Sequence, residues 1–218
     1  MVADIYTQNI SSGPTRLREK IGEYLASRMP LVIDAMRLQR LDLSDNLLPY
    51  PNKYDVYDAN EADNYPVVGV YVSSTDEWKR VETTTRGTQY FDVKYDVTLF
   101  VVGQTAQLGL DNSSFVIWET PERDSAIKMR DNLHTALRQV VINGPSFGTA
   151  GTDMRLSADI ESIKEAFPPP IQAAQTSVYV CSGVMNLSVF QYEPIVAPTY
   201  GPVETISTDI ELMGAVEE

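Results

Sequence analysis

Apolar and polar residues alternate most regularly between residues 89 and 102. Alternation with a period of two is typical of a β-strand that has one buried face. One face would carry Phe91, Val93, Tyr95, Val97, Leu99 and Val101. The other face would carry Asp92, Lys94, Asp96 and Thr98, and it becomes apolar at Phe100 and Val102. We expect the first face to pack under a helix.

The second face of this strand changes character along its length. Its polar half, with Asp92, Lys94 and Asp96, is expected to face solvent, a channel or a neighbouring molecule. Its apolar end, with Phe100 and Val102, is expected to be covered by the connection at residues 108–118 or by another copy of the chain.

A helix is predicted over residues 121–142, because apolar residues recur there at helical spacing. Thr120 is a suitable N-cap, Pro121 suits the first helical position, and Gly144 followed by Pro145 would end the helix. Its apolar stripe consists of Ala126, Met129, Leu133, Leu137 and Val140. We expect this helix to cover the strand described above.

A leading helix is predicted over residues 11–28, with apolar residues again at helical spacing. Pro30 interrupts the pattern, so a kink or a break is expected there. Leu31, Ala35 and Leu38 indicate a second helical piece. Amphipathic stretches of this kind usually cover a sheet, and a separate role in binding a partner is the alternative.

Four further strands are indicated. The stretch at 67–73 is apolar on both faces, and a shorter polar strand at 81–86 would form a hairpin or meander with the strand at 89–102. Alternation at 154–161 slips in phase, which predicts a β-bulge, and 175–192 reads as a strand in which Gly183 allows a bend. The fold class is therefore α+β, with a largely antiparallel sheet, a long helix packed on one face and a leading N-terminal helix.

We expect a single domain over residues 1–195, with long loops at about 42–66 and 103–120. Residues 196–218 read as an extended acidic arm. The arm is too apolar to be a free tail, and we expect it to dock on another surface, of its own chain or of a neighbour. Its apolar residues include Tyr200, Ile206, Ile210, Leu212 and Met213.

Charge is strongly negative and unevenly distributed. The formal net charge is −13, which repels nucleic-acid phosphates and argues against specific binding to duplex DNA. Acidic residues gather between 41 and 77, and basic residues gather at 16–40 and 123–138. Such runs are commonly solvated surfaces, but an acidic surface of one copy can also meet a basic surface of the next. The candidate interface residues are Asp55, Asp58, Glu61 and Asp63 on the acidic side, and Arg123, Arg130 and Arg138 on the basic side.

The sequence shows no set of residues that points to catalysis. His134 is the one histidine, expected at the surface or half-buried in its helix, and Cys181 is the one cysteine, expected as a buried thiol. One histidine and one cysteine do not form a structural zinc site, and the acidic loop lacks the spacing of a calcium-binding loop. We therefore expect no enzyme, no metal, no cofactor and no membrane segment. The single cysteine cannot form an intramolecular disulfide, which suits a reducing compartment.

The order of elements resembles a known family. A leading amphipathic helix is followed by "YPVVGVYV" and "QYFDVKYDVTLFVVG", by the helix "PERDSAIKMRDNLHTALRQVVI", and by "MRLSADIESIKEAF" and "QTSVYVCSGVMNLSVFQYEP". Over roughly residues 15–192 the chain resembles the tail-terminator (tail-completion) proteins of tailed bacteriophages, and the related neck proteins of the head–tail joint. The long loops and the C-terminal arm depart from that pattern.

The resemblance implies a homo-oligomeric ring, commonly a hexamer, which caps the tail tube and docks to the head connector while DNA passes through. The expected partners are the chain itself, the tail-tube protein and the head-connector or neck proteins. The expected location is the virion, after assembly in the host cytoplasm. Two alternatives stay open: another neck, collar, connector or sheath-linked virion protein, and a small-molecule-binding α+β domain or enzyme with an unrecognised site.

Overall fold

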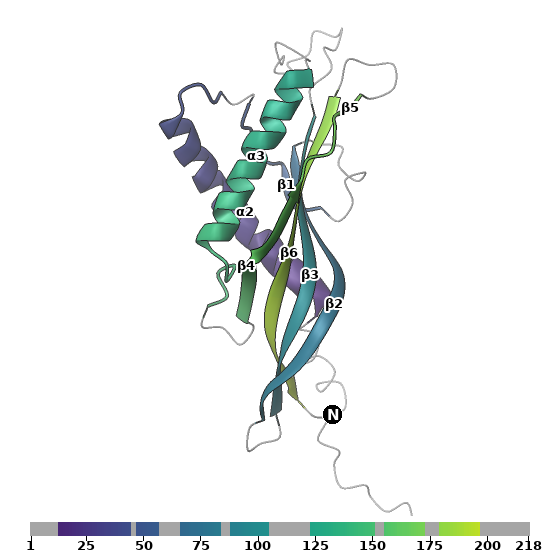
Figure 1. Cartoon of the computed structure of the whole chain (residues 1–218). Coiled ribbons are helices and arrows are strands. Elements are labelled where there is room, and N and C mark those ends of the chain that lie inside the picture. Colours follow the sequence, from purple (N-terminus) through teal and green to yellow (C-terminus); the bar gives the residue numbers. More distant parts are fainter. Residues whose placement is uncertain are drawn as a thin grey trace, which may run out of the picture.

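The computed structural model describes residues 13–44, 47–56, 66–83, 88–104, 123–150, 155–172 and 179–196. These residues form an α+β fold with two helices and one mixed sheet (Figure 1). The elements are α2 (Pro14–Gln39), β1 (Lys53–Val56), β2 (Val67–Thr83), β3 (Thr88–Gln104), α3 (Arg123–Asn143), β4 (Arg155–Ala166), β5 (Ile171–Gln172) and β6 (Tyr179–Val196). The strand order is β1-β2-β3-β6-β4, with β5 paired to β6.

Strand β3, which carries the regular alternation, lies in the middle of the sheet. It pairs antiparallel with β2 along one edge and with β6 along the other. The predicted antiparallel pairing of β2 with β3 is confirmed, although the expected turn between them lies outside the described residues. Strand β1 pairs parallel with β2, so the sheet is mixed.

Strand β2 was predicted as two separate strands, at residues 67–73 and 81–86, but it is a single strand. It runs without interruption from Val67 to Thr83. Its pairing with β3 shifts register three times, after Val72, after Thr75 and after Arg80. Each shift moves the following side chains to the opposite face, so the period of two is lost in the sequence although the strand continues.

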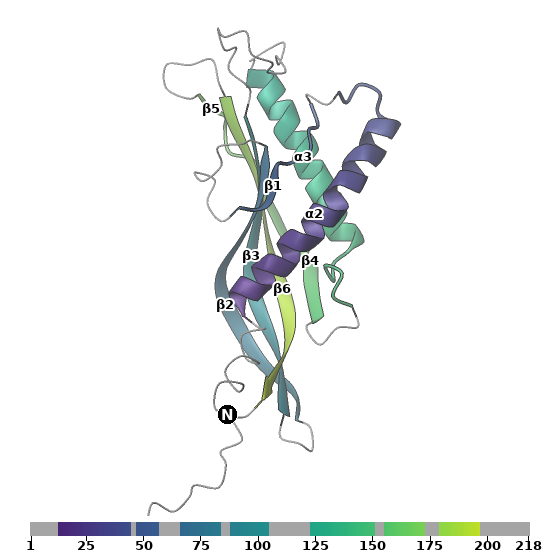
Figure 2. The same ribbon diagram turned by 180° about the vertical axis from the view of Figure 1, so that it is seen from behind.

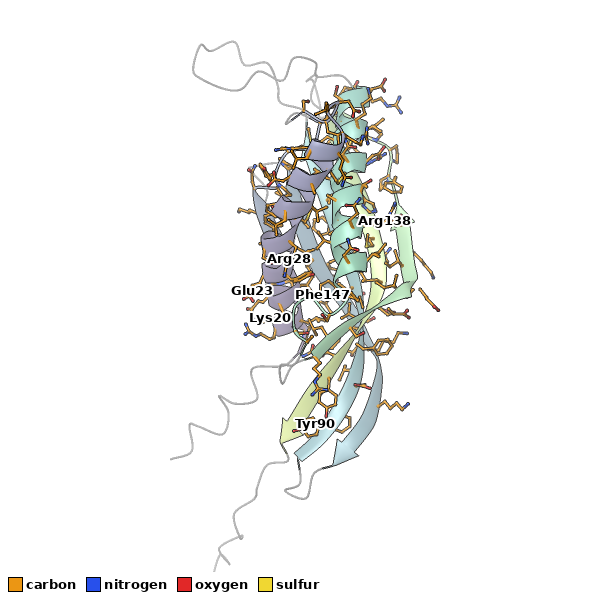
Figure 3. All side chains as sticks on the ribbon, turned by 90° about the vertical axis from the view of Figure 1, so that its left-hand side faces the viewer. Lys20, Glu23, Arg28, Tyr90, Arg138 and Phe147 are labelled. Carbon is orange, nitrogen blue, oxygen red and sulfur yellow. The ribbon has the colours of Figure 1, made fainter. Side chains whose placement is uncertain are left out.

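The two helices lie on the same face of the sheet (Figure 3). On β3 the predicted core residues Val93, Tyr95, Val97, Leu99 and Val101 are buried, and Phe91 packs partly buried against them. On α3 the whole predicted stripe from Ala126 to Val140 is buried. The helix ends before Gly144, as expected. The prediction that α3 covers β3 is therefore confirmed.

Helix α2 begins at Pro14, and it is one continuous helix with Pro30 inside. The predicted start at residue 11 and the possible break at Pro30 are therefore wrong. Leu25, Met29 and Ile33 are fully buried on both sides of the proline. Burial of these side chains outweighs the cost of about 3 kcal/mol that a proline imposes on a helix interior.

The outer side of α2 also differs from expectation. Leu31, Ala35 and Leu38 do not cover the sheet, because Met29, Ile33 and Met36 take that role. Leu31 is 58% exposed and Leu38 is 81% exposed. Figure 2 shows α2 in front of the sheet.

Two predictions concern the later strands. The phase slip in β4 is confirmed as a register shift between Asp159 and Lys164. Strand β6 pairs continuously with β3 along its whole length, so Gly183 marks no break in that pairing. The predicted loop at 42–66 contains β1 among its described residues.

Candidate functional site

Arg130, one of the predicted interface residues, is directed into its own chain. It is 7% exposed, although it lies on a helix that is rich in charge. Its Nη1 donates to the carbonyl oxygen of Pro168 at 3.0 Å, and its Nε donates to Oδ1 of Asp131 at 2.8 Å. The guanidinium carbon lies 5.2 Å from the ring centre of Phe167, within the range of a cation–π contact. Arg130 therefore holds the segment that follows β4 against α3.

Arg138 is likewise paired within the chain. Its Nε donates to Oε1 of Glu165 at 2.6 Å, and its Nη2 donates to Oε2 of the same carboxylate. Figure 3 shows Arg138 on the side of α3 that faces β4. The two-pronged bond holds the pKa of Glu165 below its ordinary value and raises the pKa of Arg138. Glu165 thus stays charged and joins β4 to α3.

His134 completes this group, which we call the Glu165 cluster (His134, Arg138 and Glu165). Its Nε2 lies 3.0 Å from Oε1 of Glu165, and its ring stacks edge-on against Phe167 with centres 4.8 Å apart. His134 is 1% exposed, so the expectation of a surface or half-buried histidine is wrong. Burial lowers its pKa, which favours the neutral ring.

Gly183 on β6 makes room for His134. A Cβ atom at this position would lie 2.9 Å from Nδ1 of His134, closer than such atoms normally approach. The glycine is thus explained by the close approach of α3 to the sheet. The Nδ1 atom is buried and has no hydrogen-bond partner among the described residues. His134 is thus packed between α3 and the sheet, while Arg138 and Glu165 stay partly exposed, and this geometry suits a structural link between α3 and β4.

Arg123 is the predicted basic residue that remains exposed, at the start of α3. It lies seven residues before Arg130, so both occupy the same side of the helix. Asn132, two residues after Arg130, points to the other side, where its Nδ2 donates to the carbonyl oxygen of Leu47 at 2.9 Å. The segment around Leu47 and the arginines thus lie on different sides of α3.

The face of the sheet away from the helices carries Asp92, Lys94 and Asp96. All three side chains are partly exposed. Asp96 is fixed by its neighbour strand, because Oγ of Ser74 donates to its Oδ2 at 2.8 Å. Further along, Thr98 donates to Oδ1 of Asn186 at 2.7 Å. We call this surface the open face, and its polar side chains share it with the exposed Tyr71 and Phe190, which lie opposite Thr98 and Lys94.

The apolar end of the open face lies at Phe100 and Val102. Val102 is 3% exposed, and it forms a small cluster with Val67, Phe100 and Val180. Gly69 lies opposite Phe100 in β2, and a Cβ atom at Gly69 would collide with the ring. Side chains of β2, β3 and β6 thus cover this end in part. The connection at 108–118, which was expected to cover it, lies outside the described residues.

Several predicted interface residues lie outside the described residues: Asp58, Glu61, Asp63, Tyr200, Ile206, Ile210, Leu212 and Met213. Asp55 belongs to β1, but its side chain is not described. Their assignment to an interface stays a prediction.

Sequence reasoning missed two features of this region. The first is Glu165, which follows the phase slip of β4 and comes 27 residues or more after its partners on α3. The second is the outward position of Leu31 and Leu38. A signal for the second was present, because Met29, Ile33 and Met36 form a competing apolar stripe on the same helix.

Searches for other kinds of site within the described part of the chain add little. There, no group of three or more histidine, cysteine, aspartate or glutamate side chains could hold a metal ion. Neither described helix is long and apolar enough to span a membrane. No protein-family model matches the chain, and no curated protein matches it significantly.

Proposed function

We propose that this chain is a structural protein of a tailed bacteriophage, namely a tail terminator at the head–tail neck. It would form a homo-oligomeric ring, most simply a hexamer, that caps the tail tube and docks to the head connector. The order of elements carries the proposal: a leading helix, a β-hairpin, a second helix on the same face, and a closing antiparallel pair. This is the order on which the resemblance to tail-terminator proteins depends.

Ring closure requires two different surfaces of one copy that fit each other. Arg123 and the segment around Leu47 lie on different sides of α3, since Asn132 binds that segment on one side and Arg123 is exposed on another. The segment around Leu47 leads into the acidic stretch of the chain, and Arg123 is basic. Opposite charges on separate surfaces favour a head-to-tail contact between neighbouring copies.

The open face suits a channel wall. Asp92 and Asp96 are partly exposed beside Lys94, in a chain of net charge −13. A wall that repels phosphate lets DNA pass without being held. In this proposal the partners are further copies of the chain, the tail-tube protein and the head-connector or neck proteins, and assembly takes place in the host cytoplasm before incorporation into the virion.

The proposal is tested by the mass and shape of the full chain. Sedimentation equilibrium and negative-stain imaging should show closed rings with a central opening, and added rings should cap the free end of purified tail tubes. A stable monomer that leaves tube growth unchanged would contradict the proposal.

Charge reversal on α3 can test whether its basic residues contact a neighbouring copy, provided that the residue changed has no bond to the described part of its own chain. Arg130 and Arg138 are bonded within the chain, so reversal there disturbs the fold as well as any interface. Arg123→Glu changes an exposed residue and should weaken ring formation, and the effect should diminish at high salt. Lys128→Glu, at another exposed position of α3, is the matched control and should leave the ring intact. Equal effects of the two variants would remove Arg123 from the interface.

A further inference from the structure

Helix α2 carries an apolar stripe on the side opposite its buried residues. Leu31, Ala35 and Leu38 follow each other at spacings of four and three, which places them on one side of the helix. Leu41 follows just beyond the helix end. Leu31, Leu38 and Leu41 are 58%, 81% and 96% exposed. A row of exposed leucines on one helix is a feature of surfaces that bind a partner. We call these four residues the leucine stripe.

Helix α2 and the residues just after it carry a net positive charge, in contrast to the protein as a whole, because residues 14–42 contain six lysine or arginine residues and four aspartate or glutamate residues. Arg28 lies three residues before Leu31, and Arg40 lies two residues after Leu38. Arg28 lies over the ring of Tyr24 and forms no ion pair with a described residue, and Arg40 pairs with the exposed Asp42. Two acidic residues lie among them: Asp42, and Asp34, which accepts a hydrogen bond from Tyr50. The stripe therefore fits an apolar partner that is acidic.

The C-terminal sequence of this chain has that composition. Residues 203–213 include Glu204, Asp209 and Glu211, and no lysine or arginine follows Lys164. Their apolar members Val203, Ile206, Ile210 and Met213 are spaced by three, four and three residues. This is the same helical periodicity as that of the leucine stripe, so the two sequences can bury one apolar row against another.

Chain length indicates which copy supplies the segment. Val196, the last residue of β6, pairs with Thr88, at the opposite end of β3 from Val102. Fourteen residues of strand separate these ends, or about 46 Å at ~3.3 Å per residue.

The leucine stripe lies toward the Val102 end. Near the end of α2, Arg37 donates to the carbonyl oxygen of Leu48. Four residues after Leu48, the backbone of Asn52 donates to the carbonyl oxygen of Pro66. Pro66 precedes Val67, which pairs with Val102. Figure 1 likewise shows the end of β6 near the bottom and the C-terminal end of α2 near the top. The seven residues from Val196 to Val203 span at most about 25 Å. The segment of the same chain is thus too short to lay its apolar row along the stripe.

We infer that the leucine stripe of one copy binds residues 203–213 of a second copy. Leu31, Leu38 and Leu41 would pack against the apolar row from Val203 to Met213, and Arg28 and Arg40 would attract the carboxylates beside that row. The inference does not rest on the proposed function, because such a contact could link copies in any assembly.

Disulfide trapping tests the contact in the full chain. Cys181 is 1% exposed, and burial raises the pKa of its thiol, so added surface cysteines report without interference. A Leu38→Cys variant is mixed with a size-tagged Ile210→Cys variant under mild oxidation. We expect a mixed disulfide dimer in roughly tenfold excess over the control mixture, because docking raises the local concentration of the two thiols.

Two matched controls define the specificity. Ile171→Cys replaces Leu38→Cys with another exposed apolar position, at 69% exposure, and Thr208→Cys replaces Ile210→Cys with a polar residue that does not belong to the apolar row. Circular dichroism of each variant checks that the fold is kept. Mixed dimers that form equally in the control mixtures would overturn the inference.

The chain that carries both Leu38→Cys and Ile210→Cys identifies the occupant. Linked dimers or larger species support a second copy. A monomer of this double variant closed by an internal disulfide would show that the segment binds its own helix. In the mixing experiment, a predominance of Leu38→Cys homodimers would show that two stripes bind each other. Either result overturns the inference. Trapped dimers without rings would refute only the proposed function, and rings without trapped dimers would refute only this contact.

Discussion

Helices α2 and α3 cover the same face of the sheet, but they use their remaining surfaces in different ways. Two arginines of α3 are bonded within the chain, since Arg130 reaches the Pro168 carbonyl oxygen and Arg138 binds Glu165. On α2 the apolar residues Leu31 and Leu38 turn outward. Arginines that looked like interface residues therefore stabilise the fold, and leucines that looked like core residues are exposed. Residue type alone does not separate a structural surface from a binding surface.

The largest expected effect compares two leucines of α2. Leu25→Ala removes a fully buried side chain and should lower the free energy of unfolding by about 3 kcal/mol. Leu31→Ala, on the outer side of the same helix, should change it by less than about 0.5 kcal/mol. Urea denaturation of both variants at low protein concentration measures the difference. Similar losses would show that the outer side of α2 is covered within one chain.

The second prediction concerns Glu165. Glu165→Ala leaves the buried His134 and the Arg138 guanidinium without their shared partner, and it should cost roughly 1.5 kcal/mol of unfolding free energy. Glu161→Ala, an exposed position of the same strand, is the control and should be nearly neutral. Chemical denaturation at pH 7 provides the measurement. If the two variants lost the same stability, the Glu165 cluster would not be what joins β4 to α3.

The smallest effect is a dependence of stability on pH. The pKa of His134 is lowered by burial from its ordinary value of 6.5, so the unfolded chain takes up a proton at a higher pH than the folded chain. This contribution to stability is complete above pH 6.5 and is lost as the pH falls below it. The pKa of Glu165 is lowered chiefly by its hydrogen bond with Arg138, so its contribution is lost below its ordinary value of 4.5.

Because the chain has one histidine, the upper part of this range reports on a single residue. Between pH 7.5 and 5.5 the unfolding temperature of the unmutated protein should fall, and it should fall less in the His134→Gln variant. An unchanged slope in the variant would assign the decline to other groups.

Much of the fold could be predicted from the sequence, because long regular periods survive tertiary packing. The alternation of β3 and the stripe of α3 both gave the buried residues correctly. Prediction failed where local patterns were interrupted. Register shifts divided β2 into apparent pieces, and Pro30 suggested a break that the packing of Met29 and Ile33 prevents.

The contacts of the predicted site residues could be predicted less well. The partner of Arg138 lies 27 residues away, and nothing in the sequence distinguishes Glu165 from Glu161 as its partner. Whether Arg130 is an interface residue or a structural one depends on the position of the Pro168 carbonyl oxygen, which only the three-dimensional path of the chain fixes.

The central position of β3 has a consequence for folding. Its partner β2 immediately precedes it, but its partners on β6 come 76 residues later (Gln104 and Val180) to 108 residues later (Thr88 and Val196). During synthesis one edge of β3 stays unpaired until most of the chain has left the ribosome. Closing such long loops is slow, and an unpaired strand edge invites aggregation. We therefore expect β3–β6 pairing to be a late step in folding and the stage at which a chaperone has most effect on yield.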